Sequence, residues 1–289
     1  MDFALILIGS VGGLLAGIMG VGGGLIFIPV LTYLFSQQGL PTDEIVKFTL
    51  ANSIALVFAS GISGIFRQYR MGIYNFKNSL SVGIPGAAAA AFTSYLIQQG
   101  SWYSHQRFSY VFLIFLLISI SNMLFIRDPQ NPSPNPRLPS PNPRHPSPDP
   151  RHPSPDPRPL KPIFVGLLAG SVVSLSGLGG GIIMVPLFRM FLKMPTKSAT
   201  ALSLSVVPLL AILPIIQYIN QQSVPNLPLW HTQYLVWPYY LPMATGVIFF
   251  SSFGQKLATK MSAISIRVIF ALLSLTILIK TVYELFQTL

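Results

Sequence analysis

The sequence GVGGGLIFIP at residues 20–29 occurs a second time, with changes only between apolar residues, as GLGGGIIMVP at residues 177–186. Both copies read G-x-G-G-G, then four apolar residues and a proline. Upstream of each lies the string GLLAG, at residues 13–17 and 166–170. Each glycine disfavours a helix by about 1 kcal/mol relative to alanine. The repeated stretch therefore predicts a helix break inside each of two long apolar segments.

The correspondence between the two copies continues downstream of the glycines. The matching residues are Lys47, Ala51 and Ser53 in the first copy and Lys197, Ala201 and Ser203 in the second. An ordered series of this kind predicts a duplication, with one membrane repeat at residues 1–127 and a second at residues 162–289, as in many transporters. Each repeat is expected to hold one Gly-rich broken or re-entrant segment followed by three transmembrane helices.

The composition of the chain is that of an integral membrane protein. Apolar residues make up 51% of the 289 residues and charged residues only 9%, whereas soluble domains carry about 25% charged residues. The mean hydropathy is +0.60. Six stretches are nearly free of charge and long enough to cross a hydrocarbon layer of about 30 Å: residues 48–66, 78–98, 108–126, 198–216, 234–253 and 264–286. With the Gly-rich segments 3–35 and 162–192, they predict an all-α fold embedded in lipid.

The positions of the 18 Lys and Arg residues distinguish two topologies. If all eight apolar segments cross the membrane, the cations divide ten against eight between its sides. If both Gly-rich segments enter and leave on one face, six helices cross and the division is fifteen against three. The positive-inside rule favours the second arrangement, in which the repeats are inverted and both termini lie outside. Eight full transmembrane helices are the alternative.

Further features follow from the inverted topology. Met1 and Asn226 are predicted to face the exterior, on the same side as the three minority cations Lys47, Arg107 and Lys280. Aromatic residues near the ends of the spans are expected in interfacial belts: Trp102, Tyr103, Trp230, Tyr234, Trp237, Tyr239 and Tyr240.

Residues 128–161 differ from both repeats. Four heptapeptides, NPSPNPR, LPSPNPR, HPSPDPR and HPSPDPR, fill positions 131–158. Proline at every second or third position removes backbone donors and favours polyproline II. We expect a solvated cytoplasmic linker between the repeats, with a ligand for proline-recognition domains as the alternative.

The glycine clusters are the candidate site. A half-helix that starts there presents unpaired backbone N–H groups and the positive end of its dipole. Two such ends near the membrane centre would form an anion site without a charged side chain. The predicted substrate-binding glycines are Gly22, Gly23, Gly24, Gly179, Gly180 and Gly181, and the structural residues of the motifs are Gly20, Pro29, Gly177 and Pro186. Close helix packing is the alternative, and we prefer it for the upstream glycines Gly9, Gly13 and Gly17.

Polar side chains on the next helix of each repeat could add hydrogen bonds to the substrate. Thr49, Asn52 and Ser53 stand at i, i+3 and i+4 and therefore share one face. Thr200 and Ser203 occupy the comparable face in the second repeat. We expect these side chains to donate to a bound oxyanion, although Ser and Thr in membrane helices also bond to the i−4 carbonyl or bridge helices.

Missing residue types exclude several functions. None of the seven Asp and Glu residues falls in the middle of a predicted span, and a cation transporter or a carboxylate proton relay would need one there. The chain has no cysteine and no histidine inside a span. The sequence therefore predicts no metal site, no cofactor and no catalytic residue. The basic residues lie in short loops that membrane topology explains, so no nucleic-acid partner is expected.

The doubled G-x-G-G-G-x4-P motif, with each copy followed by an A-x-S helix, resembles the TauE/SafE family of sulfite and sulfonate exporters. The resemblance covers nearly the whole chain apart from residues 128–161. It implies a bacterial-type inner-membrane permease that moves small sulfur-containing or organic anions. The alternative functions are an anion channel, which would use the same half-helix dipoles, and a non-transporting membrane scaffold that recruits partners through the proline insert.

Overall fold

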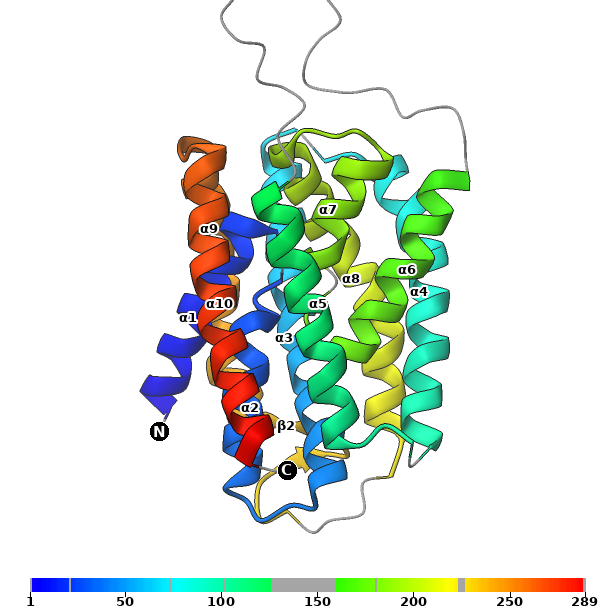
Figure 1. The fold of residues 1–289 in the computed structure, drawn as a ribbon, viewed down its shortest axis with the longest axis vertical. Coiled ribbons are helices and arrows are strands. Elements are labelled where there is room, and N and C mark those ends of the chain that lie inside the picture. The colour runs from blue at the N-terminus through cyan, green and yellow to red at the C-terminus, as the bar shows by residue number, and fades with distance from the viewer. Residues whose placement is uncertain are drawn as a thin grey trace, which may run out of the picture.

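The computed structural model describes residues 2–20, 22–72, 74–100, 102–125, 160–179, 181–222 and 227–287. Met1, the heptapeptides, Gly180 and Asn226 lie outside the described residues, and so do the predictions that rest on them. The described chain is almost entirely helical and forms a bundle (Figure 1). Its first helices are α1 (Asp2–Met19), α2 (Gly24–Ser36), α3 (Thr42–Arg70), α4 (Phe76–Gln99) and α5 (His105–Phe125). After the linker come α6 (Leu160–Ser176), α7 (Gly181–Phe191), α8 (Thr196–Asn220), α9 (Trp237–Lys260) and α10 (Ala263–Gln287).

Long apolar helices confirm the membrane-embedded fold. Within the described ranges, three helices are long and apolar enough to cross a bilayer, at Thr42–Arg70, Phe76–Gln99 and Ser198–Asn220. They contain the spans expected at 48–66, 78–98 and 198–216. The described apolar stretches of α5 and α10 are shorter, at His105–Ile118 and Ala271–Val282. Large apolar side chains such as Phe92 and Phe249 are exposed on the outside of the bundle, where lipid would cover them.

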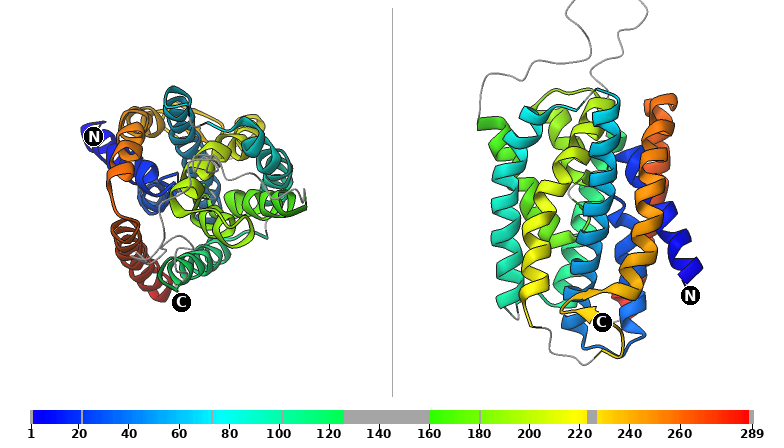
Figure 2. Two further views of the ribbon diagram at one scale, coloured as in Figure 1. Left: turned by 90° about the horizontal axis from the view of Figure 1, so that it is seen from above. Right: turned by 180° about the vertical axis from the view of Figure 1, so that it is seen from behind.

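The two Gly-rich segments are broken helices that turn back on themselves. In Figure 1, α1 runs from the N-terminus into the bundle and α2 returns to the same end, whereas α6 and α7 enter and leave from the opposite end. We call the end that holds the N-terminus and residues 37–41 the terminal face. The other end, where α5 finishes and α6 starts, is the linker face. Figure 2 shows the same arrangement from above and from behind.

Hydrogen bonds between distant segments fix these directions. Gln38 Nε2 donates to Tyr239 Oη at 2.9 Å, which places the end of α2 and the start of α9 at the terminal face. Gln68 Nε2 donates to the Ala201 carbonyl at 2.9 Å, which places the end of α3 and the start of α8 at the linker face. Eight full spans would put the two members of each pair on opposite sides of the membrane. The contacts are those of an arrangement in which both Gly-rich segments re-enter.

Glycine stripes allow the broken helix of each half to lie against a helix of the other half. On α1, a Cβ at Gly9 or Gly17 would lie 2.1 Å from the Met243 or Ser251 carbonyl oxygen of α9. On α6, a Cβ at Gly170 would lie 1.9 Å from the Gly86 carbonyl oxygen of α4. No side chain fits at such distances, so these glycines permit close backbone packing, as predicted for the upstream glycines of α1.

A short hairpin precedes α9 where the sequence predicted a helix from residue 234. Strands β1 (His231–Thr232) and β2 (Leu235–Val236) pair antiparallel, and Gln233 between them has a positive φ of 53°. Three of the aromatic residues expected in interfacial belts are buried, since Tyr103 is 5%, Tyr234 0% and Tyr239 1% exposed. The belt prediction is therefore wrong for these three, because the Tyr103 hydroxyl donates to the Leu175 carbonyl of α6, the hairpin folds into the bundle, and Tyr239 packs beside Phe35.

Cysteine labelling tests the topology. Gly39→Cys and Gly72→Cys both lie in turns where a Cβ would meet no atom within 4 Å, and Ser262 is exposed between α9 and α10. A membrane-impermeant thiol reagent should modify Gly39→Cys from outside intact cells, and Gly72→Cys and Ser262→Cys only after permeabilisation. The natural chain has no cysteine and serves as the blank. Modification of Gly72→Cys and Ser262→Cys from opposite sides would contradict the re-entrant arrangement.

Candidate functional site

Glycines in left-handed conformations make both helix breaks. Gly20, Gly22 and Gly23 have φ values of 70°, 78° and 80°. In the second break, Gly177 and Gly179 have φ values of 65° and 77°. Residues with a Cβ rarely adopt these angles, so the chain leaves the helix at each cluster and starts a new one at the last glycine. The helix break predicted inside the Gly-rich segment 3–35 lies between α1, which ends at Met19, and α2, which starts at Gly24.

The two breaks are in direct contact. A Cβ at Gly24 would lie 2.6 Å from the Leu178 Cα and 2.8 Å from the Gly177 carbonyl oxygen. A Cβ at Gly20 would lie 2.6 Å from the backbone oxygen of Thr200, on α8. The first cluster therefore meets the second cluster and also α8, which follows α7 in the chain. Gly22, Gly23, Gly179 and Gly181 are all buried.

Two serines at matching positions tie each break to the opposite half. Ser53 Oγ on α3 donates to the Gly177 carbonyl at 2.8 Å. Ser203 Oγ on α8 donates to the Gly20 carbonyl, also at 2.8 Å. Both side chains are fully buried. Since each hydroxyl proton is used inside the protein, the structure shows these serines bridging helices, and direct donation to an anion stays a prediction that requires the bonds to open.

Asn52 holds the hairpin. Its Nδ2 donates to the Phe48 carbonyl at 2.8 Å and to the Tyr234 carbonyl at 2.9 Å, and its Oδ1 accepts the Val236 amide at 3.0 Å. The buried amide thus finds partners for both of its donor hydrogens and for its oxygen. Asn52 and Ser53 are adjacent in the chain, so this point of α3 connects the hairpin at the terminal face with the break between α6 and α7.

The remaining predicted residues line the same region. Thr49 is buried, and its hydroxyl lies 3.4 Å from that of Thr32 on α2. Thr200 contributes its backbone beside Gly20. Pro29 and Pro186 each fall inside the helix that follows a break, at the sixth residue of α2 and of α7. The sequence reasoning missed Ser60, whose hydroxyl approaches the Gly22 carbonyl at 3.3 Å; its place inside a predicted span was the available signal.

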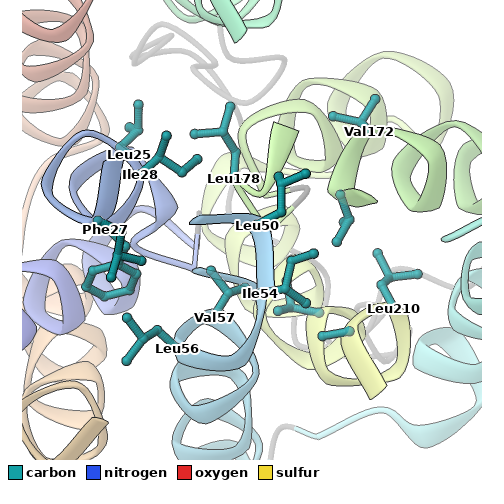
Figure 3. Close-up of a cluster of buried hydrophobic side chains, with 14 of the residues drawn as sticks. Leu25, Phe27, Ile28, Leu50, Ile54, Leu56, Val57, Val172, Leu178 and Leu210 are labelled. Atoms are coloured by element: carbon teal, nitrogen blue, oxygen red, sulfur yellow. The ribbon is translucent and has the colours of Figure 1, made fainter. Parts of the chain in front are cut away.

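The first turn of α2 offers backbone donors to the break. The Gly23 carbonyl accepts the amides of Ile26 and Phe27. The amides of Gly24 and Leu25 have no acceptor among the described residues. Apart from the polar side chains described above, the surrounding side chains are apolar, with Leu25, Ile28 and Leu178 beside Leu50 and Ile54 (Figure 3). In such surroundings the electrostatic features of the breaks are the helix dipoles and peptide groups.

The described residues contain no cluster of His, Asp or Glu that could hold a metal ion. The described acidic residues of α3, Asp43 and Glu44, stand in its first turn at the terminal face, away from the breaks. An anion at the breaks would therefore meet no carboxylate from α3, the helix that contacts both of them.

Comparisons with known proteins agree with this architecture. The family model described as Sulfite exporter TauE/SafE matches residues 5–281. A probable membrane transporter protein of Methanocaldococcus jannaschii is 28% identical over 265 residues, which cover 91% of this chain and 89% of that protein. The probable membrane transporter protein YunE of Bacillus subtilis is 25% identical over 283 residues, 97% of each chain. No solved structure matches the chain. The paired, mutually contacting helix breaks thus occur in a chain that belongs to the TauE/SafE family of membrane transporters.

Proposed function

We propose that this transporter moves small anions across the cell membrane, with sulfite and organosulfonates as its substrate class, through a site formed between the two helix breaks. The observation that carries the proposal is the contact of Gly24, the first residue of α2, with Gly177 and Leu178, which places the N-terminal end of α2 against the break from which α7 starts at Gly181. Helix N-termini attract anions through their dipoles and free amides. The sulfur oxyanion class follows from the description of the matching family.

We infer that the site arises from two inverted repeats, residues 1–127 and 162–289. The packing supports this origin because equivalent helices make equivalent contacts. Helix α1 lies on α9 as α6 lies on α4, and α5 contacts α7 as α10 contacts α2. The bonds from Ser53 and Ser203 to the opposite break are reciprocal in the same way. Movement of one repeat against the other would alter both breaks together and open the site alternately to each face.

A flux assay tests the substrate class. The purified full-length protein in liposomes should take up sulfite and a small sulfonate such as methanesulfonate with saturable kinetics, and empty liposomes should not. Saturation distinguishes a transporter from an anion channel, which would instead give large single-channel currents. Flux of sodium or potassium ions without flux of either anion would contradict the proposal.

Replacing the two bridging serines tests whether the breaks are the site. Ser53→Ala combined with Ser203→Ala removes one hydrogen bond at each break, worth about 1 kcal/mol apiece, and should lower the turnover of sulfite roughly fivefold or more. Ser81→Ala is the matched control, because Ser81 Oγ also donates to a backbone carbonyl, that of Asn78, but on the exposed side of α4. Equal turnover in the double variant and the control would show that the breaks are not part of the transport route.

A further inference from the structure

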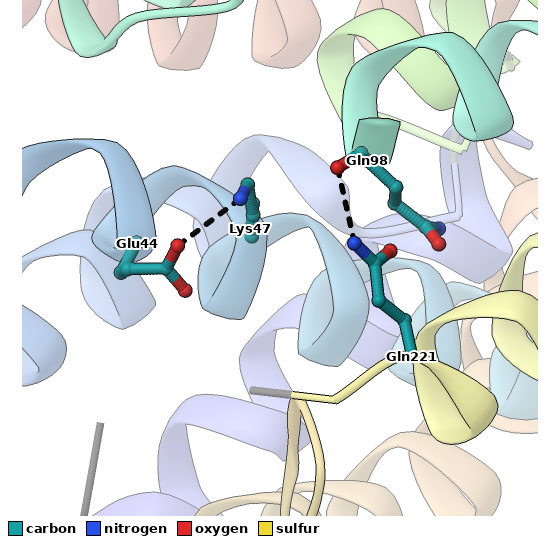
Figure 4. Close-up of polar contacts among 4 residues, drawn as sticks. All are labelled: Glu44, Lys47, Gln98 and Gln221. Carbon is teal, nitrogen blue, oxygen red and sulfur yellow. Dashed lines mark hydrogen bonds and ion pairs between the residues drawn. The ribbon is translucent and has the colours of Figure 1, made fainter. Parts of the chain in front are cut away.

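A second polar cluster lies at the terminal face, where the sequence predicted no site. It comprises Glu44 and Lys47 on the first turns of α3, Tyr218 near the end of α8, Tyr234 of the hairpin, and the glutamines Gln98 and Gln221 at the ends of α4 and α8. Figure 4 shows the Glu44–Lys47 pair on α3 and the Gln98–Gln221 pair at the ends of α4 and α8. We call these six residues the outer cluster.

Contacts connect the members of the outer cluster. Lys47 Nζ lies 3.0 Å from Glu44 Oε1 and 5.9 Å from the centre of the Tyr234 ring. The Tyr234 ring packs against the Tyr218 ring with 5.9 Å between centroids. Gln221 Nε2 donates to the Gln98 carbonyl at 3.0 Å. The side chains of Lys47 and Glu44 are only 20% and 13% exposed, so the pair is partly withdrawn from solvent and screened less than a surface pair.

Polar atoms of the outer cluster are buried without a hydrogen bond. Among the described residues they include Glu44 Oε2, the hydroxyls of Tyr218 and Tyr234, and Gln221 Oε1. Tyr218 and Tyr234 are 1% and 0% exposed. Burial, with the nearby Glu44 carboxylate, raises the pKa of the Tyr234 hydroxyl, which therefore stays protonated as a donor. The Tyr234 hydroxyl lies beside the Glu44 carboxylate, and the Tyr218 hydroxyl lies beside Gln98 and Ser94. Buried polar groups in native proteins are nearly always satisfied by protein or water, so a polar ligand or water would complete the hydrogen bonding of these atoms.

The outer cluster is connected to the helix breaks through α3. Lys47 precedes Asn52 and Ser53 by less than two helical turns, about 9 Å along the axis. Asn52 bonds the backbone of Tyr234, and Ser53 bonds the Gly177 carbonyl. An anion that left Lys47 toward the bundle centre would follow α3 past these residues to the breaks.

We propose that Lys47 is the outer binding residue for the anionic substrate, and that Glu44 occupies it as an internal counter-anion until the substrate displaces the carboxylate. The proposal rests on the proposed function, because it assigns the step before the anion reaches the breaks. A sulfite or sulfonate group offers oxygens that accept hydrogen bonds, as a carboxylate does, so it can replace Glu44 at Lys47 Nζ. The Tyr234 hydroxyl is the neighbouring donor.

The experiment uses the full-length protein in two assays. Sulfite flux into liposomes gives KM and turnover, and sulfite binding in detergent is measured by the shift of the thermal unfolding midpoint. Lys47→Gln should raise KM and the dissociation constant for sulfite roughly tenfold, the effect of losing a charged hydrogen-bond partner, with a smaller change in turnover. Lys47→Arg should retain most of the affinity. Glu44→Gln should lower KM, because the internal competitor is gone.

The double variant separates competition from a structural role. If Glu44 acts through Lys47, Glu44→Gln adds nothing when Lys47→Gln is present, and the double variant matches Lys47→Gln alone. Arg107→Gln is the control, since Arg107 is an exposed cation whose guanidinium donates to the Trp102 carbonyl; its KM should equal that of wild type.

Each outcome decides a separate point. Wild-type flux with KM unchanged in Lys47→Gln overturns the outer site and leaves the proposed function standing. Sulfite binding that depends on Lys47 without any flux supports the outer site and overturns the proposed transport of sulfite. Absence of both flux and binding in wild type overturns both. If Lys47→Gln does not fold, Glu44→Gln decides, and an affinity equal to wild type in that variant ends the proposal.

Discussion

Gly23→Val is expected to abolish the folded transporter rather than merely weaken its affinity. A Cβ at Gly23 would lie 2.7 Å from the Gly12 carbonyl oxygen and 2.8 Å from the Phe27 ring. The residue also has a φ of 80°, which costs an L-amino acid about 1–2 kcal/mol. Overpacking in a tight core adds roughly 1–3 kcal/mol. The folded yield in detergent, measured by size-exclusion chromatography, and the thermal midpoint should both fall sharply.

Gly39→Val separates the two contributions. Gly39 has a φ of 69°, yet a Cβ there would meet nothing within 4 Å, so this variant carries the backbone strain without the contacts. It should remain folded and active. If Gly23→Val instead proved as stable as Gly39→Val and failed to transport, the glycine would be a contact for the anion. Wild-type affinity in a stable Gly23→Val protein would end the half-helix anion site.

Asn52→Ala is expected to destabilise the protein by roughly 2–6 kcal/mol, because it leaves the Val236 amide and the Tyr234 carbonyl buried without partners at about 1–3 kcal/mol each. The hairpin should loosen as well. Trp230 and Trp237 stack at its two ends with 5.6 Å between ring centroids, so tryptophan emission should shift. Chemical unfolding in detergent measures the stability.

Asn220→Ala is the matched control for Asn52→Ala. Asn220 Nδ2 makes the same kind of bond, to the carbonyl four residues earlier, but the residue is exposed. Its replacement should change stability by no more than about 0.5 kcal/mol. If Asn52→Ala kept wild-type stability and raised KM for sulfite, the amide would be a substrate ligand, as its place beside Ser53 on α3 predicts.

The glycine clusters made the helix breaks predictable, because three adjacent glycines disfavour a continuous helix wherever they occur. The stripe of Gly9, Gly13 and Gly17 was equally readable, since a spacing of four places the residues on one face. Both inferences depend on local geometry alone. The division of Lys and Arg residues between the two sides of the membrane also predicted that each Gly-rich segment enters and leaves on one face. This topology is a property of the whole chain and is not encoded in any single motif.

Hydrogen-bond partners were not predictable in the same way. Ser53 and Ser203 were identified as a matched pair, but nothing local shows that each would bond a carbonyl more than 100 positions away. The buried amide of Asn52 finds its partners in a hairpin. Residues 234–236 are apolar, and the sequence therefore predicted them as the start of a helix. The outer cluster was missed because its glutamines fall at the ends of spans, where polar residues are common.

The pairing of α1 with α9 has a consequence for biosynthesis. Gly9, Gly13 and Gly17 pack against residues synthesised almost a full chain length later, whereas α6 finds α4 already made. The first half of the protein therefore enters the membrane with its glycine stripe facing lipid, and it is completed only when α9 inserts. Long waiting times of this kind expose an intermediate to misassembly. A ribosome pause or a bound chaperone during synthesis of the linker would act on a half-protein that ends before Ser203. In this half-protein the Gly20 carbonyl of the first break does not yet have its hydrogen bond from Ser203.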